Sequence, residues 1–214
     1  MTPRCAASKW PESSQPIRPT SHTNTNPNHL MKLTLLTLAL TLALPTLHAA
    51  DKSLLDAPVK DIAGKATTLK PYAGKVLLIV NTASQCGSTP QYAGLEALHK
   101  KFGTRGFAVL GFPSNDFGEQ EPADNAAIKK FCTATYNVTF PLFAKSQVKP
   151  GPEQNPVFTA LTGPASPLPG DVGWNFAKFL VGRDGKLLKR FDTSVEPDDT
   201  DLLKALESAL AKKP

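Results

Sequence analysis

The sequence predicts an α/β domain in which a central mixed β-sheet carries helices on both faces. Two continuous apolar runs are typical of strands covered on both faces, and apolar residues at helical spacing follow each run. The strands are expected at 76–81 and 107–112, and the helices at 92–103 and 124–136. Near the C-terminus, Asp184 and Gly185 form a strong two-residue hairpin signal inside the segment 176–191.

The remaining elements complete this layout. A leading hairpin is expected within 53–75, where Pro and Gly punctuate short apolar stretches, and a short helix near 155–161. The last helix, 197–211, has a stripe of leucines at positions 202, 203, 206 and 210. The order strand, helix, strand, helix, followed by strand, strand, helix, predicts a thioredoxin-like fold.

The first 50 residues are expected to lie outside the domain. Residues 1–30 are rich in Pro, Ser, Thr and Asn and poor in clustered apolar residues, so we predict a leader that is disordered or not translated. Residues 31–50 match a secretory signal peptide, with Met31 as start, an apolar stretch too short to span a bilayer, and small residues before the cleavage site. A buried core helix is the alternative. The domain, 51–214, is then exported, with the periplasm as its expected location.

Charge and cysteine content narrow the function. The net charge of +6 falls to about +3 without residues 1–50, which is too mild to indicate nucleic acid or a stable membrane anchor. Two thiols, Cys86 and Cys132, remain in the domain. In an oxidising compartment they indicate either a structural disulfide or a redox pair. A domain of this size does not need a disulfide for stability, which weakens the first reading.

Cys86 lies where the first buried run gives way to the next helix. Open α/β sheets place their sites at that end of the strands, and a helix N-terminus there favours a thiolate. A buried, inert cysteine is the alternative. Thr89 stands where a dithiol exchanger has its second cysteine, so an ordinary C-x-x-C site is excluded.

Three segments resemble the glutathione peroxidase family, in its cysteine-containing, thioredoxin-dependent form. They are NTASQCGSTPQYAGLEAL from position 81, FPSNDFGEQEP at 112–122 and WNFAKFL at 174–180. The resemblance covers nearly the whole domain and places Cys86 at the position of the catalytic selenocysteine or cysteine. It implies a peroxidase that reduces hydrogen peroxide and organic or lipid hydroperoxides, without a metal or other cofactor.

The resemblance also implies partners for the thiol: Gln120, Trp174 and Asn175. Each brings an N–H donor without a titratable proton, suited to stabilise a thiolate and the charge on a departing oxygen. Taken singly, each has an ordinary explanation as a solvated loop residue, a core aromatic or a turn cap. Ser114 and Asp116 depart from the family pattern, and Asp116 would oppose the thiolate if it pointed inward.

Cys132 matches the resolving cysteine of the thioredoxin-dependent members. The implied cycle converts Cys86 to a sulfenic acid, which condenses with Cys132 to a disulfide that an external dithiol reduces. A buried helix residue is the alternative for Cys132, and the disulfide is expected to require local unfolding. Residues 144–173 lack an assembly segment and glutathione-binding basic residues, so we expect a monomer reduced by a thioredoxin-like protein rather than glutathione.

Two rival functions use the same residues. A peroxide sensor would pass the oxidation of Cys86 to a client protein. A non-catalytic thioredoxin-like binding module would consume no peroxide. The joint occurrence of Cys86 with Gln120, Trp174 and Asn175 argues against it.

Overall fold

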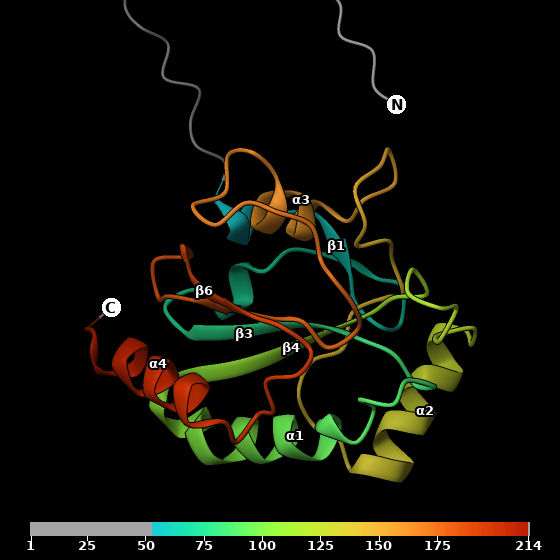
Figure 1. Ribbon diagram of the computed structural model, residues 1–214, viewed down its shortest axis with the longest axis horizontal. Coiled ribbons are helices and arrows are strands. Elements are labelled where there is room, and N and C mark those ends of the chain that lie inside the picture. The colour runs from blue at the N-terminus through green and yellow to red at the C-terminus, as the bar shows by residue number, and fades with distance from the viewer. Residues whose placement is uncertain (1–52, 214) are drawn as a thin grey trace, which may run out of the picture. The chain divides into compact units, whose positions relative to one another are not determined.

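A computed structural model describes residues 53–213 of the chain (Figure 1). The predicted leader and signal peptide, 1–50, lie outside the described residues. Within the described part, no helix is both long and apolar enough to cross a membrane.

The domain is organised around one four-stranded mixed sheet in the order β4-β3-β5-β6. Its strands are β3 (Val76–Thr82), β4 (Phe107–Pro113), β5 (Lys178–Val181) and β6 (Leu187–Phe191). Strand β3 runs parallel to β4 and antiparallel to β5, which pairs antiparallel with β6. The predicted thioredoxin-like arrangement is therefore confirmed.

Helices cover both faces of this sheet, as predicted (Figure 1). Helices α1 (Gln91–Phe102) and α4 (Thr200–Ala211) lie on one face, and α2 (Asn125–Tyr136) lies beside α1. The opposite face carries α3 (Pro156–Thr162) and the leading hairpin, β1 (Val59–Lys60) with β2 (Ala66–Thr67). Three single 3-10 turns complete the elements: Leu54–Asp56, Lys70–Tyr72 and Gly103–Arg105.

The alternation of side chains along β3 divides the core in two. Val76, Leu78 and Val80 pack with the apolar residues of α1, α2 and α4, whereas Leu77 and Ile79 pack with those of α3. All five side chains are fully buried. Because both faces of β3 are covered, the site must form at its carboxyl end, in the loops.

Helix α2 has well-defined ends but little buried surface. Asp124 caps its N-terminus, since the carboxylate accepts a hydrogen bond from the Ala127 N–H at 2.8 Å. Asn137 ends it in the left-handed conformation. Only Ile128 and Cys132 of its twelve residues are buried, so few apolar contacts oppose its local opening.

Candidate active site

Cys86 lies in a tight turn between β3 and α1. Its N–H donates to the Thr89 hydroxyl at 3.0 Å, and the Thr89 N–H donates to the Cys86 carbonyl at 3.0 Å. The predicted helix N-terminus lies further on, because α1 begins only at Gln91. The N–H that reaches the Cys86 sulfur is that of Ser88, at 3.4 Å, so a turn amide replaces the expected helix end.

Thr89 has a role that the sequence analysis missed. Its hydroxyl both accepts from Cys86 and donates to the Ala83 carbonyl at 3.0 Å, and its side chain is buried. The residue that stands in place of a second cysteine thus holds the turn closed around the first. The signal in the sequence was a Thr three residues after Cys86, a spacing at which a hydroxyl bonds a turn backbone.

The loop that carries Gln120 is bonded to the other two predicted segments. The Gln85 N–H donates to the Gln120 carbonyl at 3.0 Å, and the Asn175 side-chain amide donates to Gln120 Oε1 at 2.9 Å. Since Gln120 accepts through its oxygen, its amide nitrogen is turned to donate elsewhere. The structure therefore brings the loops of Cys86, Gln120 and Asn175 together at the carboxyl end of β3.

Trp174 and Asn175 differ in exposure although they are neighbours. The Trp174 side chain is 43 % exposed and packs on Phe117 with ring centroids 5.6 Å apart, whereas Asn175 is fully buried. Asn81 fixes the backbone of this segment: its side-chain amide donates to the Trp174 carbonyl at 3.0 Å, and its carbonyl accepts from the Phe176 N–H. Asn81 was missed as a site residue, although a polar residue ending an apolar run was the available signal.

Strained backbone marks the same loops. Glu119 and Phe176 have positive φ angles of 53° and 62°, and Gly118 adds a third at 63°. Left-handed conformations are costly for side chains such as these and persist only where the surroundings enforce them, most often at functional sites. Glu119 directly precedes Gln120, and Phe176 directly follows Asn175.

Asp116, one of the departures from the family pattern, faces away from the thiol. Its carboxylate accepts hydrogen bonds from the backbone N–H groups of Val148 and Lys149, at 2.6 and 2.8 Å. The possibility that Asp116 points toward the thiol is therefore wrong, because both backbone donors hold its carboxylate at the 145–149 loop. Ser114 is buried and its hydroxyl accepts from the Asp116 N–H, which supports the same turn.

Cys132 is a residue of α2, and its side chain is fully buried. Burial, aided by the negative charge of Glu121, raises the pKa of this thiol to about 11. Both Cys86 and Cys132 are free thiols and belong to one apolar cluster. The structure thus holds the two cysteines on the same side of the sheet without a bond between them.

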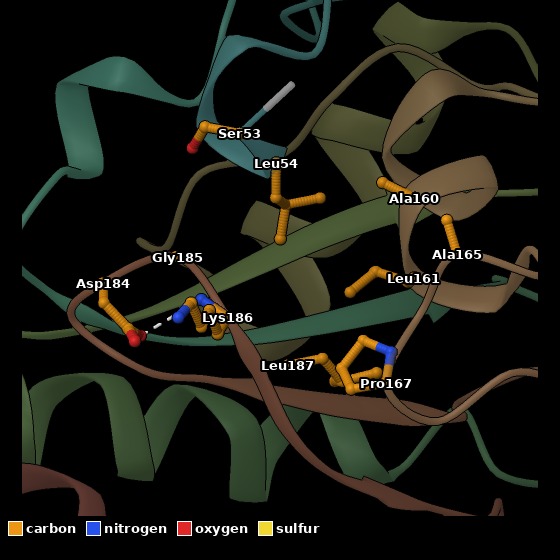
Figure 2. Close-up of a pocket in the computed structure, with 10 residues that line it drawn as sticks. All are labelled: Ser53, Leu54, Ala160, Leu161, Ala165, Pro167, Asp184, Gly185, Lys186 and Leu187. Atoms are coloured by element: carbon orange, nitrogen blue, oxygen red, sulfur yellow. Dashed lines mark hydrogen bonds between the residues drawn. The ribbon is translucent and has the colours of Figure 1, made fainter. Parts of the chain in front are cut away.

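A pocket of about 500 Å³ lies at the other end of the sheet (Figure 2). The pairing of Leu77 with Val181 places the β5–β6 turn beside the amino end of β3, opposite to Cys86. The pocket is lined by Ser53, Leu54, Ala160, Leu161, Ala165, Pro167, Asp184, Gly185, Lys186 and Leu187. It brings together no thiol and none of the predicted site residues, so its size does not make it the site.

A thioredoxin-like fold that carries a single cysteine at the end of β3, with amide donors in the facing loops, defines a class of thiol-dependent redox proteins other than dithiol exchangers. The chain belongs to the glutathione peroxidase family: the family model for glutathione peroxidase matches residues 54–162.

Curated relatives and a solved structure agree with this assignment. The chain is 54 % identical over 143 residues to the hydroperoxy fatty acid reductase gpx1 of Synechocystis, covering 64 % of this chain and 84 % of the relative. It is 46 % identical over 181 residues to the thioredoxin/glutathione peroxidase BtuE of Escherichia coli, covering 75 % and 98 %. The crystal structure of Trgpx in apo form aligns with a TM-score of 0.60 at 34 % identity, covering 77 % and 99 %. The chain is therefore an enzyme, a thiol peroxidase that reduces hydroperoxides.

Proposed function

We propose that Cys86 is the thiol that attacks the peroxide. Its thiolate forms a bond to one peroxide oxygen while the O–O bond breaks, which oxidises Cys86 to a sulfenic acid. The other oxygen leaves with a proton as water or an alcohol. Gln120, Trp174 and Asn175 are the proposed donors that stabilise the thiolate and the departing oxygen.

One observation carries this proposal: hydrogen bonds link the three loops at the carboxyl end of β3. Gln120 accepts from Gln85 through its backbone and from Asn175 through its side chain, so the donor set is fixed before a substrate arrives. Preorganised donors act without the cost of reorientation during the reaction. A buried, merely structural cysteine would not require Thr89 and Ser88 to shape a turn around its backbone and sulfur.

Cys132 is the proposed resolving residue. Its thiol attacks the Cys86 sulfenic acid to form a disulfide, and water is released. Since Cys132 is fully buried, the carboxyl half of α2 must open for this step. The small buried face of α2, Ile128 and Cys132, is consistent with such local opening.

The proposed reductant is a thioredoxin-like protein, and the proposed substrates include lipid hydroperoxides. The names of two relatives, a thioredoxin/glutathione peroxidase and a hydroperoxy fatty acid reductase, support these choices. The exposed Trp174 offers an apolar face for a bulky substrate. A monomeric state and a periplasmic location also remain predictions, which gel filtration and cell fractionation would test.

The test is steady-state turnover of wild-type protein and Cys132→Ser with thioredoxin or glutathione, using hydrogen peroxide and a lipid hydroperoxide. We expect wild type to turn over faster with thioredoxin. Cys132→Ser should reduce about one equivalent of peroxide and then stop with thioredoxin, because no disulfide forms. Normal turnover of this variant with thioredoxin would contradict the resolving role.

A further inference from the structure

The loop between β6 and α4, residues 192–199, has no part in the reaction as proposed, yet buried side chains hold its backbone. Lys178 of β5 donates from Nζ to the carbonyls of Val195, at 2.5 Å, and Thr193, at 3.4 Å. Gln91, the first residue of α1, donates to the same Thr193 carbonyl at 2.8 Å. Both donating side chains belong to buried residues. The 192–199 loop is therefore tied to β5 and to α1 at once.

The burial of Lys178 makes these hydrogen bonds necessary. Because side chains alternate along a strand, Lys178 lies on the same face of β5 as Leu180, which packs with the apolar residues of α1 and α4. Lys178 is fully buried there, and burying an ammonium group is costly unless hydrogen bonds compensate it. Its acceptors within residues 53–213 are the two carbonyls of the 192–199 loop. The same bonds thus satisfy the amine and fix the loop.

The Thr193 side chain extends this support to the site. Its hydroxyl donates to the Asn175 carbonyl at 2.6 Å. The next N–H, that of Phe176, donates to the Asn81 carbonyl at 2.7 Å. The peptide unit that joins Asn175 to Phe176 is therefore hydrogen-bonded through its C=O and through its N–H, and these two bonds fix its orientation.

The orientation of this peptide matters because it precedes a strained residue. Phe176 has a φ of 62°, and rotation of the preceding peptide would return this angle to the favoured negative range. The same rotation would turn the backbone of Asn175. The side-chain amide of Asn175 donates to Gln120 Oε1 at 2.9 Å and to the Phe117 carbonyl at 3.3 Å. Loss of the bond from Thr193 would therefore release the strain and displace the Asn175 amide.

We propose that Thr193 is a positioning residue of the peroxidase reaction: its hydroxyl fixes the peptide after Asn175, so that the Asn175 amide stays directed at the site. The inference rests on the proposed role of Asn175 as a donor. Thr193 acts through Asn175 and does not touch the peroxide. Since Lys178 and Gln91 hold the Thr193 backbone, the hydroxyl is in place before the substrate arrives, as a preorganised site requires.

The test is the first turnover of Thr193→Val, which removes the hydroxyl and keeps the branched shape of the side chain. Stopped-flow mixing with hydrogen peroxide measures the rate of sulfenic acid formation. We expect this rate to fall about tenfold, which corresponds to the loss of one hydrogen bond that aids the reaction. Thr193→Ser retains the hydroxyl and should keep the wild-type rate.

A double variant separates positioning from a general effect on the fold. In Asn175→Asp the amide donor is already lost, so there is no donor left for Thr193 to position. Adding Thr193→Val to Asn175→Asp should therefore change the first-turnover rate less than twofold. A substitution that acts on the fold alone would instead lower the rate by the same factor with and without Asn175.

Thr162→Val is the matched control. The Thr162 hydroxyl also donates to a backbone carbonyl, that of Phe158 at 2.7 Å, but it lies in α3 on the other face of the sheet. We expect this variant to lose stability in urea unfolding at least as much as Thr193→Val, because its hydroxyl is the more buried, and to keep the wild-type first-turnover rate.

Three results would overturn the proposal, and they differ in what they remove. A wild-type rate in Thr193→Val, with Asn175→Asp slow, would remove the positioning role and leave Asn175 as a donor. The same tenfold loss with and without Asn175 would show that the hydroxyl acts on the fold. A wild-type rate in Asn175→Asp would remove the donor role itself, and with it the part of the proposed function on which the inference rests.

Discussion

The two thiols of the domain have opposite surroundings. Cys86 lies in a loop 9 % exposed, with its backbone bonded to Thr89 and its sulfur in contact with the Ser88 N–H. Cys132 lies inside a helix, is fully buried, and has a pKa that burial raises to about 11. One thiol lies near the surface in a hydrogen-bonded turn, and the other is held as a neutral thiol on a helix with a small buried face.

This difference explains how two free cysteines can lie in one domain without reacting prematurely. The thiolate is the nucleophile, so a buried neutral thiol resists oxidation until its helix opens. A hydrogen-bonded loop suits an encounter with a small peroxide, whereas a helix with only two buried side chains suits the local opening proposed for the joining of two protein sulfurs. Four substitutions test this division, and they follow in order of expected effect.

The largest effect should come from Cys86→Ser. We expect the rate of peroxide reduction to fall at least about 1,000-fold, because an alcohol remains protonated at neutral pH and is a weak nucleophile. Peroxide consumption in the first turnover measures it, with Cys132→Ser as the control that should keep the first turnover. Appreciable peroxide reduction by Cys86→Ser would show that the Cys86 thiol is not the reacting one.

The second largest effect concerns the hydrogen-bond donors proposed to act at Cys86. Asn175→Asp keeps the shape of the side chain but replaces the N–H donor to Gln120 with an acceptor. Because this bond holds the Gln120 side chain, its loss should misplace the Gln120 donor; loss of one donor to the developing charge typically costs about 3 kcal/mol, or roughly 100-fold in the rate of sulfenic acid formation. Stopped-flow measurement of the first turnover would detect it.

A matched control for this change exists in α3. Asn155→Asp makes the same chemical change at a buried helix cap, where Asp serves as well as Asn. Equal rates for Asn175→Asp and wild type would mean that the hydrogen bond to Gln120 holds the loops but does not aid the chemistry.

The third prediction concerns the effect of the Cys132 thiol on stability at alkaline pH. Unfolded Cys132 loses its proton near its ordinary pKa of 9.0 and folded Cys132 near 11, so the folded state binds more protons between these values. Its contribution to stability is complete below pH 9 and is lost as pH rises through 11, by about 3 kcal/mol. Urea unfolding of reduced wild type and Cys132→Ala should therefore converge as pH rises.

The ionisation of Lys178 changes the stability in the opposite direction, so its effect must be removed from the comparison. Burial lowers the pKa of this fully buried amine to about 8, so the unfolded state binds more protons up to about pH 10.5 and stability rises with pH. The residue is present in both proteins, so their difference isolates Cys132. A constant difference in unfolding free energy from pH 7 to 10.5 would show that the Cys132 thiol ionises in the folded state as it does in the unfolded chain.

The fold followed from local pattern, but the surroundings of the thiols did not. Apolar runs and the Asp184–Gly185 turn predicted the sheet and its helices, because each depends on neighbours in the sequence. The three segments that resemble the glutathione peroxidase family predicted which loops meet. The clamp by Asn81 and the direction of Asp116 depend on hydrogen bonds between a side chain and a distant backbone group, which no local pattern encodes. The turn of Cys86 did have a local signal, Thr89, which was missed.

The smallest effect should come from Asp116→Asn, which tests whether the reaction at Cys86 is independent of the loops that support its site. The carboxylate accepts from two N–H groups of the 145–149 loop, and a neutral amide accepts them more weakly. We expect the free energy of unfolding to fall by about 1–2 kcal/mol and the first-turnover rate to change less than twofold. Glu119→Gln makes the same charge change at an exposed position of the same loop and should alter neither. A rate increase in Asp116→Asn alone would mean that its charge reaches Cys86, against the direction in which its side chain points.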